Sequence, residues 1–321
     1  MYTRREALPT VTTATISQTA LDEPRFDERF EALLERGRTE HAAERLAEAL
    51  GTFREAERLA HELGDRRAVD RAFVNQCGVV IEKDRSLSPD SFQRLREIVM
   101  AADNQTNTRL AAYNLARAHE CLKQNRKGLF YARIALDRSR ILGSPDWLAS
   151  SHNQMGNFFL AESRFQEARE EYERALELLP SDPSRRKALI LTNLGYALMV
   201  LGSPEGLPLV YRSLRMSRSL GAHRDEIFAH LDLCFGLLEL GRFRHAIRHG
   251  AAALALSEEA QAPDSTRLAL FLLGEAAQQS GDPETAQDLF KRLQERYFPE
   301  ASYLPDVLMT VDVCKLINLR A

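Results

Sequence analysis

Residues 155–180 read MGNFFLAESRFQEAREEYERALELLP, and the order of small and large side chains in this stretch decides the fold. Gly156, Ala168 and Ala175 are small, and Tyr172 lies between the two alanines. No reaction requires this spacing, whereas two tightly packed helices do, because small side chains on one helix leave room for large ones on the other. The stretch therefore predicts a helical hairpin.

The small residue at Gly156 recurs along the chain at intervals of 38 to 41 residues. The aligned positions are Gly37, Gly78, Ala116, Gly156, Gly195, Cys234 and Gly274, and the large side chain of the second helix recurs as Phe53, Tyr172, Tyr211 and Phe290. Such a period is the signature of a solenoid. Each unit has the pattern of two amphipathic helices joined by a short turn, and no stretch alternates like a strand. We expect an all-α fold.

Pairs of a capping residue and a proline mark several expected helix starts. A proline is tolerated at the first helical position, and Ser or Asp before it can accept from the free backbone N–H groups. The pairs are Ser88-Pro89, Ser144-Pro145, Asp182-Pro183, Ser203-Pro204 and Asp282-Pro283.

The order small residue, aromatic, Ala, aromatic, Ala, Pro resembles the tetratricopeptide repeat (TPR) family, and residues 149–182 match it best. The spacing near 40 residues is similar to the long-repeat variety found in kinesin light chains and bacterial peptide receptors. This resemblance implies a right-handed α–α superhelix, a TPR solenoid, with about seven helix hairpins over residues 25–300. The early tryptophan of the family is missing from every repeat.

The two ends of the chain differ from the repeats. Residues 1–24 are polar and Thr-rich, and we expect them to form a flexible N-terminal arm. Residues 301–321 carry apolar side chains at helical spacing, including Leu304, Leu308 and Val311. Because the last repeat of a solenoid has an apolar face without a neighbour, we expect this segment to be a C-terminal capping helix.

Composition favours a soluble folded chain. Of the 321 residues, 44% are apolar and 28% are charged. The 43 basic and 46 acidic residues give a net charge of −3, which does not indicate a basic surface for nucleic acid. No apolar run could span a bilayer, and the first residues lack the apolar core of a secretory signal. Only six of the basic residues are lysine, which we interpret as the trace of a GC-rich bacterial genome. The four separated cysteines (Cys77, Cys121, Cys234, Cys314) indicate reduced core residues in the cytoplasm.

Catalytic motifs are absent from the sequence, so no catalytic residue, cofactor or metal is predicted. His245 and His249 lie one helical turn apart, but they lack the third and fourth ligands of a metal site. Arg212, Arg215 and Arg218 raise the alternative of a phosphate-contacting stripe, which the acidic balance makes unfavourable.

The TPR resemblance implies that the first helix of each repeat lines a groove. Asparagine can donate to and accept from a peptide backbone, and arginine can bind a carboxylate through two hydrogen bonds. The same asparagines could instead cap helices, bridge repeats or face water. The polar groove residues carried over are Asn75, Tyr113, Asn114, Arg117, Asn153, Asn157, Thr192, Asn193 and Tyr196.

The later repeats contribute an apolar set to the same expected groove. Phe228, Leu231 and Phe235 recur on one side of a helix that is apolar nearly all round, and Phe271 follows in the next repeat. Such a helix is either buried in its own protein or presents a binding surface. Both alternatives are open, since superhelical closure, the N-terminal arm or the C-terminal helix could cover these side chains.

The interpretation that unites these patterns is a non-enzymatic protein–protein interaction module, a regulatory adaptor or scaffold that binds a peptide or protein segment in its groove. Two other roles remain alternatives: an intracellular sensor of a signalling peptide that controls a second protein, and a self-assembling structural scaffold that forms homo-oligomers. No membrane partner is expected and a nucleic-acid partner is disfavoured. Fold by itself does not decide among these functions.

Overall fold

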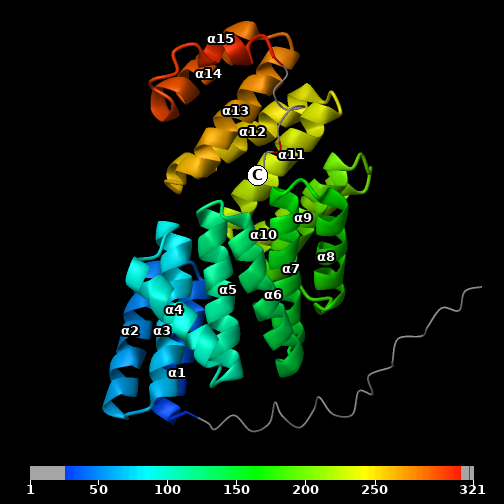
Figure 1. Cartoon of the computed structure of the whole chain (residues 1–321). Helices are drawn as coiled ribbons and strands as arrows, with labels where there is room; N and C mark the ends of the chain where they lie inside the picture. Colours follow the sequence, from blue (N-terminus) through cyan, green and yellow to red (C-terminus); the bar gives the residue numbers. More distant parts are fainter. Residues whose placement is uncertain (1–25, 312–317, 319–321) are drawn as a thin grey trace, which may run out of the picture. The chain divides into compact units, whose positions relative to one another are not determined.

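The computed structural model describes residues 26–311 and residue 318, which contain fifteen α-helices and no strand (Figure 1). Fourteen helices form seven consecutive hairpins, so the predicted all-α fold and repeat number are confirmed. The pairs are α1 (Glu28–Ala42) with α2 (Leu46–Glu62), α3 (Arg66–Asp84) with α4 (Pro89–Ala101), α5 (Gln105–Cys121) with α6 (Asn125–Leu142), α7 (Pro145–Ala161) with α8 (Phe165–Glu177), α9 (Arg185–Val200) with α10 (Gly206–Ser219), α11 (His223–Glu239) with α12 (Phe243–Glu259), and α13 (Pro263–Gln279) with α14 (Pro283–Tyr297).

The described residues divide between two compact units, and α6 and α7 each contribute residues to both. The N-terminal unit comprises the described residues up to Leu122 together with Phe130–Leu148, and the C-terminal unit comprises Lys123–Leu129 together with the described residues from Ala149 onward. In the N-terminal unit α3 contacts both α1 and α5, and in the C-terminal unit α11 contacts both α9 and α13. Within each unit, the first helices of successive hairpins therefore lie side by side, as stacked repeats require.

Glycine on the first helix of a hairpin makes room for an aromatic ring from the second. A Cβ atom on Gly156 would lie only 2.5 Å from the Tyr172 ring, which is itself fully buried. The same contact pairs Gly37 with Phe53 and Gly274 with Phe290. These rings fill the interior of their hairpins. A larger residue in place of the glycine would push the second helix away from the first.

The fifth and sixth hairpins pack differently. The prediction of Tyr211 as the large side chain opposite Gly195 is wrong, because a Cβ on Gly195 would lie nearest to Val210 and the Gly206 carbonyl oxygen, the latter at 2.9 Å. Here a second glycine allows the helix backbones themselves to approach. In the sixth hairpin the small residue lies on the other helix: a Cβ on Gly250 would lie 3.0 Å from the Cys234 sulfur.

Three of the five predicted proline starts are confirmed. Side-chain oxygens of the preceding residues accept backbone N–H groups of the first turn in α4, α7 and α14; these residues are Ser88, Ser144 and Asp282. The other two are wrong, because α9 and α10 each begin two residues beyond the proline. In α9 the capping oxygen is that of Ser184, which accepts from the Lys187 N–H at 3.2 Å.

The terminal predictions are described only in part. The expected arm of residues 1–24 lies outside the described residues. Within the expected capping segment of residues 301–321 the structure describes a five-residue helix, α15 (Leu304–Leu308), while residues 312–317 and 319–321 lie outside the description. α15 contacts α14, and the Gln278 side chain on α13 donates to the Met309 carbonyl oxygen at 2.7 Å. This part of the segment therefore packs against the last repeat.

Candidate functional site

Three asparagine side chains on α7 and α9 form one hydrogen-bonded group, the amide cluster of Asn153, Asn157 and Asn193. Asn193 Nδ2 donates to Asn153 Oδ1 at 3.0 Å and to Asn157 Oδ1 at 3.2 Å. The Tyr172 hydroxyl also donates to Asn157 Oδ1, at 2.9 Å. Asn153 and Asn193 are buried, and Asn157 is half-buried. The cluster thus bridges successive hairpins, while its grip on a ligand stays a prediction.

A fourth amide reaches these helices from the far end of the chain. Asn318 Nδ2 donates to the Leu160 carbonyl oxygen at 2.7 Å and to Ser163 Oγ at 3.2 Å. Its carbonyl oxygen Oδ1 accepts from the Tyr196 hydroxyl at 3.4 Å. Both ends of one amide group are therefore held between the end of α7 and the middle of α9. We call the Leu160, Ser163 and Tyr196 groups the amide-binding position.

The amide cluster and the amide-binding position are neighbours on both helices. Asn157 and Leu160 are three residues apart on α7, and Asn193 and Tyr196 are three residues apart on α9. Residues at this separation occupy the same face of an α-helix. Sequence reasoning found Asn157, Asn193 and Tyr196 but not Asn318, since nothing local marks a side chain whose partners lie more than 120 residues away.

The apolar residues next to this face are mostly interior. The Tyr196 and Phe235 rings pack at 5.4 Å between centroids, with the two planes tilted by 42°. Tyr196, Leu231, Phe235 and Phe271 are between 2% and 8% exposed, whereas Phe228 is 36% exposed. Burial favours the core alternative for the first four side chains and leaves Phe228 as the member of the set at the surface.

Thr192 has a structural environment. It is buried, and its hydroxyl lies 2.7 Å from the Ser213 hydroxyl on α10. Both hydroxyl oxygens also lie within hydrogen-bond distance of the Ala188 carbonyl oxygen, at 3.2 and 2.6 Å. These bonds satisfy two buried polar groups within one hairpin, and the place of Thr192 in a ligand site stays a prediction.

In the N-terminal unit the corresponding asparagines bond to backbone. Asn114 is buried, and its Nδ2 donates to the Val74 carbonyl oxygen on α3 at 2.6 Å. Asn75 Nδ2 donates to the Arg71 carbonyl oxygen within its own helix, at 2.8 Å. Neither side chain contacts another asparagine, in contrast to the amide cluster.

Arg117 and Tyr113 are half-buried beside them on α5. Arg117 Nη1 donates to the Gly78 carbonyl oxygen at 3.3 Å, and its Nη2 lies 3.7 Å from Glu82 Oε2. The guanidinium of Arg109 lies over the Tyr113 ring, with its Cζ atom 4.7 Å from the ring centroid. Arg117 is therefore paired with a carboxylate of its own chain, and its predicted role in binding a ligand carboxylate would require competition with Glu82.

The family of the repeats follows from a sequence comparison. Residues 225–297, nearly all of the sixth and seventh hairpins, match the family model described as tetratricopeptide repeat. The sixth and seventh hairpins carry tetratricopeptide repeats. The resemblance inferred from the small and aromatic positions is thereby confirmed. No curated protein sequence matches the chain.

Solved structures share the fold across most of the chain. A Rap protein complexed with Competence and Sporulation Factor is 14% identical, with a TM-score of 0.69 over 90% of this chain and 79% of that chain. The apo form of the quorum sensor NprR from B. thuringiensis is 13% identical, with a TM-score of 0.57 over 83% of this chain and 76% of that chain. A signal transduction ATPase with a tetratricopeptide repeat sensor, from Pyrococcus horikoshii, is 15% identical, with a TM-score of 0.58 over 90% of this chain and 50% of that chain. At these identities the similarity concerns the fold.

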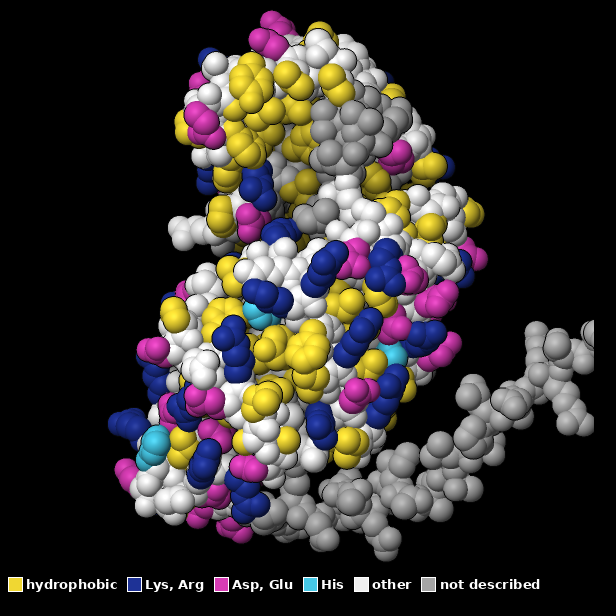
Figure 2. All heavy atoms as spheres, viewed as in Figure 1, with side chains coloured by type: hydrophobic (Ala, Val, Ile, Leu, Met, Phe, Trp, Pro, Cys, Tyr) yellow, Lys and Arg dark blue, Asp and Glu magenta, His cyan; other side chains and the backbone are white. Residues whose placement is uncertain are grey.

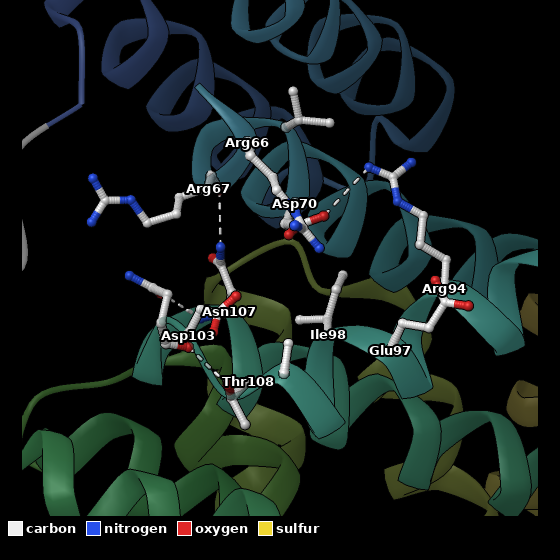
Figure 3. A pocket seen from close by; sticks show the side chains of 12 residues that line it. Arg66, Arg67, Asp70, Arg94, Glu97, Ile98, Asp103, Asn107 and Thr108 are labelled. Atoms are coloured by element: carbon white, nitrogen blue, oxygen red, sulfur yellow. Dashed lines mark hydrogen bonds and ion pairs between the residues drawn. The ribbon is translucent and has the colours of Figure 1, made fainter. Parts of the chain in front are cut away.

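A cavity of about 290 Å³ lies among α3, α4 and α5 of the N-terminal unit (Figure 3). Asp70 lies in its wall, 3.6 Å from Arg94, and burial raises the pKa of the Asp70 carboxyl group. Across the cavity Asn107 Nδ2 donates to the Arg67 carbonyl oxygen at 2.9 Å. The remaining lining residues are Arg66, Val69, Glu97, Ile98, Ala101, Asp103, Asn104 and Thr108. Three arginines and three carboxylates share this wall, so it presents no surplus of either charge.

Two histidines meet inside the C-terminal TPR hairpins. His230 on α11 and His249 on α12 place their Nδ1 atoms 2.8 Å apart. Arg218 Nη2 lies 3.0 Å from His230 Nε2, and the Tyr211 hydroxyl lies 3.5 Å from His249 Nε2. Arginine only donates, so His230 Nε2 accepts and its Nδ1–H donates to His249. Burial lowers the pKa of each imidazole to about 4, aided by Arg218 for His230 and by His230 for His249.

This geometry corrects the sequence pairing of His245 with His249, because His245 is exposed and His249 turns to His230 instead. Within residues 26–311 and position 318, no three His, Cys, Asp or Glu side chains are grouped so as to hold a metal. Arg218, one of the arginines of the possible phosphate-contacting stripe, is paired with Glu226: its Nε lies 2.7 Å from the carboxylate. Figure 2 shows basic and acidic side chains intermixed on the face in view rather than a basic stripe.

Two of the described cysteines, Cys77 and Cys234, lack the character of nucleophiles. Cys77 and Cys234 are buried free thiols, and Cys314 lies outside the described residues. Burial raises the pKa of Cys77 and of Cys234 to about 12. These two thiols are protonated at neutral pH, and thiols of that kind are inert. None of the helices described is both long enough and apolar enough to cross a membrane.

Proposed function

We propose that this chain is a non-enzymatic, cytoplasmic TPR module of a bacterium that binds an extended peptide or protein segment against α7 and α9. The observation that carries the proposal is the amide-binding position, where the Leu160 carbonyl and the Tyr196 hydroxyl hold both ends of one amide. A peptide backbone offers the same N–H donor and C=O acceptor at every residue. A position that accepts the Asn318 amide therefore has the chemistry to accept a peptide group.

The groups at this position can hold a ligand without breaking the fold. The Leu160 carbonyl already accepts the Ser163 backbone N–H at 2.9 Å, and its second lone pair accepts from Asn318. Tyr196 keeps its ring packed on Phe235 while its hydroxyl donates outward to Asn318. The half-buried Asn157 lies one helical turn away and extends the polar surface along α7.

The fold comparisons support a binding role. A similar fold occurs in a Rap protein complexed with Competence and Sporulation Factor and in the quorum sensor NprR. The NprR similarity favours one second candidate, a sensor of a signalling peptide that controls another protein. The self-assembling scaffold remains a further alternative, and light scattering during size-exclusion chromatography tests it: a mass that rises with concentration supports the scaffold.

The test of the proposed function is selection from a random peptide display library on the immobilised chain, followed by affinity measurements on variants. The double variant Asn157→Ala/Asn193→Ala should weaken the recovered peptides by roughly tenfold or more, since each lost hydrogen bond is worth about 1 kcal/mol. Asn114→Ala is the matched control, because it removes the equivalent asparagine from the N-terminal unit. Peptides that bind the double variant and the wild type equally would refute binding at this face.

A further inference from the structure

We propose that the chain regulates its own peptide site, with the Asn318 side chain as an intramolecular ligand that a partner peptide must displace. This inference rests on the proposed function and adds to it the occupant of the site. Three hydrogen bonds carry it, between Asn318 and the Leu160, Ser163 and Tyr196 groups. Every polar atom of the Asn318 amide is used in them.

The Asn318 contacts join residues that are far apart in the sequence, and they involve specific hydrogen-bonding groups. Asn318 lies 158 residues after Leu160, 155 after Ser163 and 122 after Tyr196. It joins groups from two different helices, α7 and α9, which no local turn could bring to it. A surface asparagine satisfied by water would need none of these partners. The amide of Asn318 therefore takes the place that a peptide group of a ligand would take.

The anchoring of the preceding residues makes this internal ligand effective. Leu308 is buried against the last repeat, and the Met309 carbonyl is held by Gln278 on α13. Asn318 lies nine positions after Met309 in sequence, a span of at most about 32 Å for a fully extended chain. Because Asn318 belongs to the same chain as the site, its binding is intramolecular and does not weaken on dilution. A free peptide must therefore bind more tightly than the tethered asparagine, or be present in excess of it.

Occupancy by Asn318 sets the threshold for a partner. The apparent affinity of any external peptide equals its intrinsic affinity multiplied by the fraction of molecules in which the site is empty. Anything that withdraws the C-terminal residues, such as a second protein that binds them, raises that fraction and so favours peptide binding. The same residues from a second copy of the chain could fill the site only by exchange between molecules, which the experiment below separates from the intramolecular contact.

The experiment uses the full-length chain and a synthetic peptide of its own residues 310–321, labelled with fluorescein and carrying Cys314→Ser. Fluorescence anisotropy should show that this probe binds the Asn318→Ala chain about tenfold more tightly than the wild type, because the internal ligand has been weakened. Thr310→Ala is the matched control, an exposed change in the same terminal region, and it should behave as the wild type. Adding Tyr196→Phe to the Asn318→Ala chain should weaken the probe severalfold, as should Asn318→Ala in the probe itself.

Equal probe affinity for the wild type and the Asn318→Ala chain would overturn the internal competition while leaving the proposed function intact. Absence of probe binding to both chains would also overturn it. A different result would refute the proposed function itself, namely library peptides that bind the Asn157→Ala/Asn193→Ala chain and the wild type with equal affinity.

A cross-link gives an independent readout. In a Cys314→Ser background, the pair Ser163→Cys/Asn318→Cys should form a disulfide within one molecule on mild oxidation, seen as faster migration on a non-reducing gel. The Asn318 and Ser163 side chains are 3.2 Å apart, within reach of such a bond. Tyr303→Cys with Ser163→Cys is the control and should not cross-link. Disulfide-linked dimers would indicate exchange between copies, and no cross-link would mean that the contact does not form; either result contradicts the proposal.

Discussion

The two units place an asparagine at the same repeat position and use it differently. Asn114 in the N-terminal unit and Asn193 in the C-terminal unit each lie two residues before the small residue of their repeats. Asn114 donates to a backbone carbonyl of the preceding repeat, whereas Asn193 donates to two other asparagines. A backbone partner ends the network at once. A side-chain partner carries it to the half-buried Asn157 and toward the residues that hold Asn318.

The difference teaches that residue type and repeat position do not by themselves identify a binding asparagine. What distinguishes the C-terminal unit is the partner that the amide meets. Only there, among the described residues, do a backbone carbonyl and a side chain of the first helices hold a side chain from the far end of the chain. The predictions below use the N-terminal unit as an internal control for the C-terminal one.

The largest expected difference between the two units is in their stability at acidic pH. Burial lowers the pKa of His230 and His249 to about 4, while an unfolded histidine titrates near 6.5. The stability contributed by the neutral pair is complete above about pH 6.5 and is lost as the pH falls toward 4. We expect a loss of about 3 kcal/mol for the coupled pair across this window. Glu226 opposes this trend, while Arg218, Arg248 and His245 reinforce it.

Urea unfolding between pH 7 and pH 4 measures this loss with two probes. Trp147 is the only tryptophan and reports on the N-terminal unit, while far-UV circular dichroism reports on both units. The circular dichroism transition should move to lower urea first. His230→Leu/His249→Leu should flatten the pH dependence, and an unchanged slope in this variant would contradict the assignment to the pair.

Glycine replacement on the first helices should separate the two units next. Gly156→Ala should cost about 1–3 kcal/mol, because its Cβ would lie 2.5 Å from the buried Tyr172 ring. Gly78→Ala at the equivalent position should be neutral or stabilising by up to about 1 kcal/mol, since its Cβ meets only the Asn114 oxygen at 3.4 Å and alanine favours the helix. Thermal melting followed by circular dichroism distinguishes them. Equal melting temperatures would contradict the difference in packing.

Removal of the asparagines should give a smaller difference in stability. Asn193→Ala deletes two hydrogen bonds and leaves the acceptor of buried Asn153 without that donor, an expected cost of about 1–2 kcal/mol. Asn114→Ala deletes one bond to a backbone carbonyl and should cost about 1 kcal/mol or less. Chemical denaturation at pH 7 compares the two variants. A costlier change at Asn114 would reverse the comparison.

The smallest expected effect is that of Tyr196→Phe. The ring stays packed on Phe235, and the single lost hydroxyl donates to Asn318 at 3.4 Å. Stability should fall by about 0.5 kcal/mol or less, because a long hydrogen bond at a half-buried partner is replaced by water. Tyr113→Phe is the control in the N-terminal unit. A large loss of stability in Tyr196→Phe would show that the hydroxyl is needed for the fold instead of for binding.

Sequence reasoning succeeded where a hairpin keeps the repeat's pairing of a glycine with an aromatic ring. Gly156 and Tyr172 are sixteen residues apart within one hairpin, so periodicity alone pairs them. It failed over which side chains of the two helices of a hairpin meet: His249 on α12 meets His230 on α11 rather than His245, and Gly195 on α9 meets Val210 on α10 rather than Tyr211. Side-chain direction in those cases depends on how neighbouring helices pack, which the repeat pattern does not encode.

From the sequence, the candidate site could be predicted only as a list of residues on the first helices of the repeats. The position of Asn157, Asn193 and Tyr196 on first helices follows from the repeat. The burial of Phe235 and the arrival of Asn318 do not, because they depend on contacts more than 30 and 120 residues distant in sequence. Long-range partners of this kind become visible only in the folded structure.

Photo-cross-linking tests the central claim most directly, because it reports where a bound peptide lies. A benzoylphenylalanine placed at Asn157 in one chain and at Arg117 in another occupies the same repeat position in the two units, and both native side chains are half-buried. With a library-selected peptide in the Asn318→Ala background, we predict an adduct from position 157 and none from position 117. An adduct at position 117 alone, or at neither position, would contradict binding at the α7–α9 face.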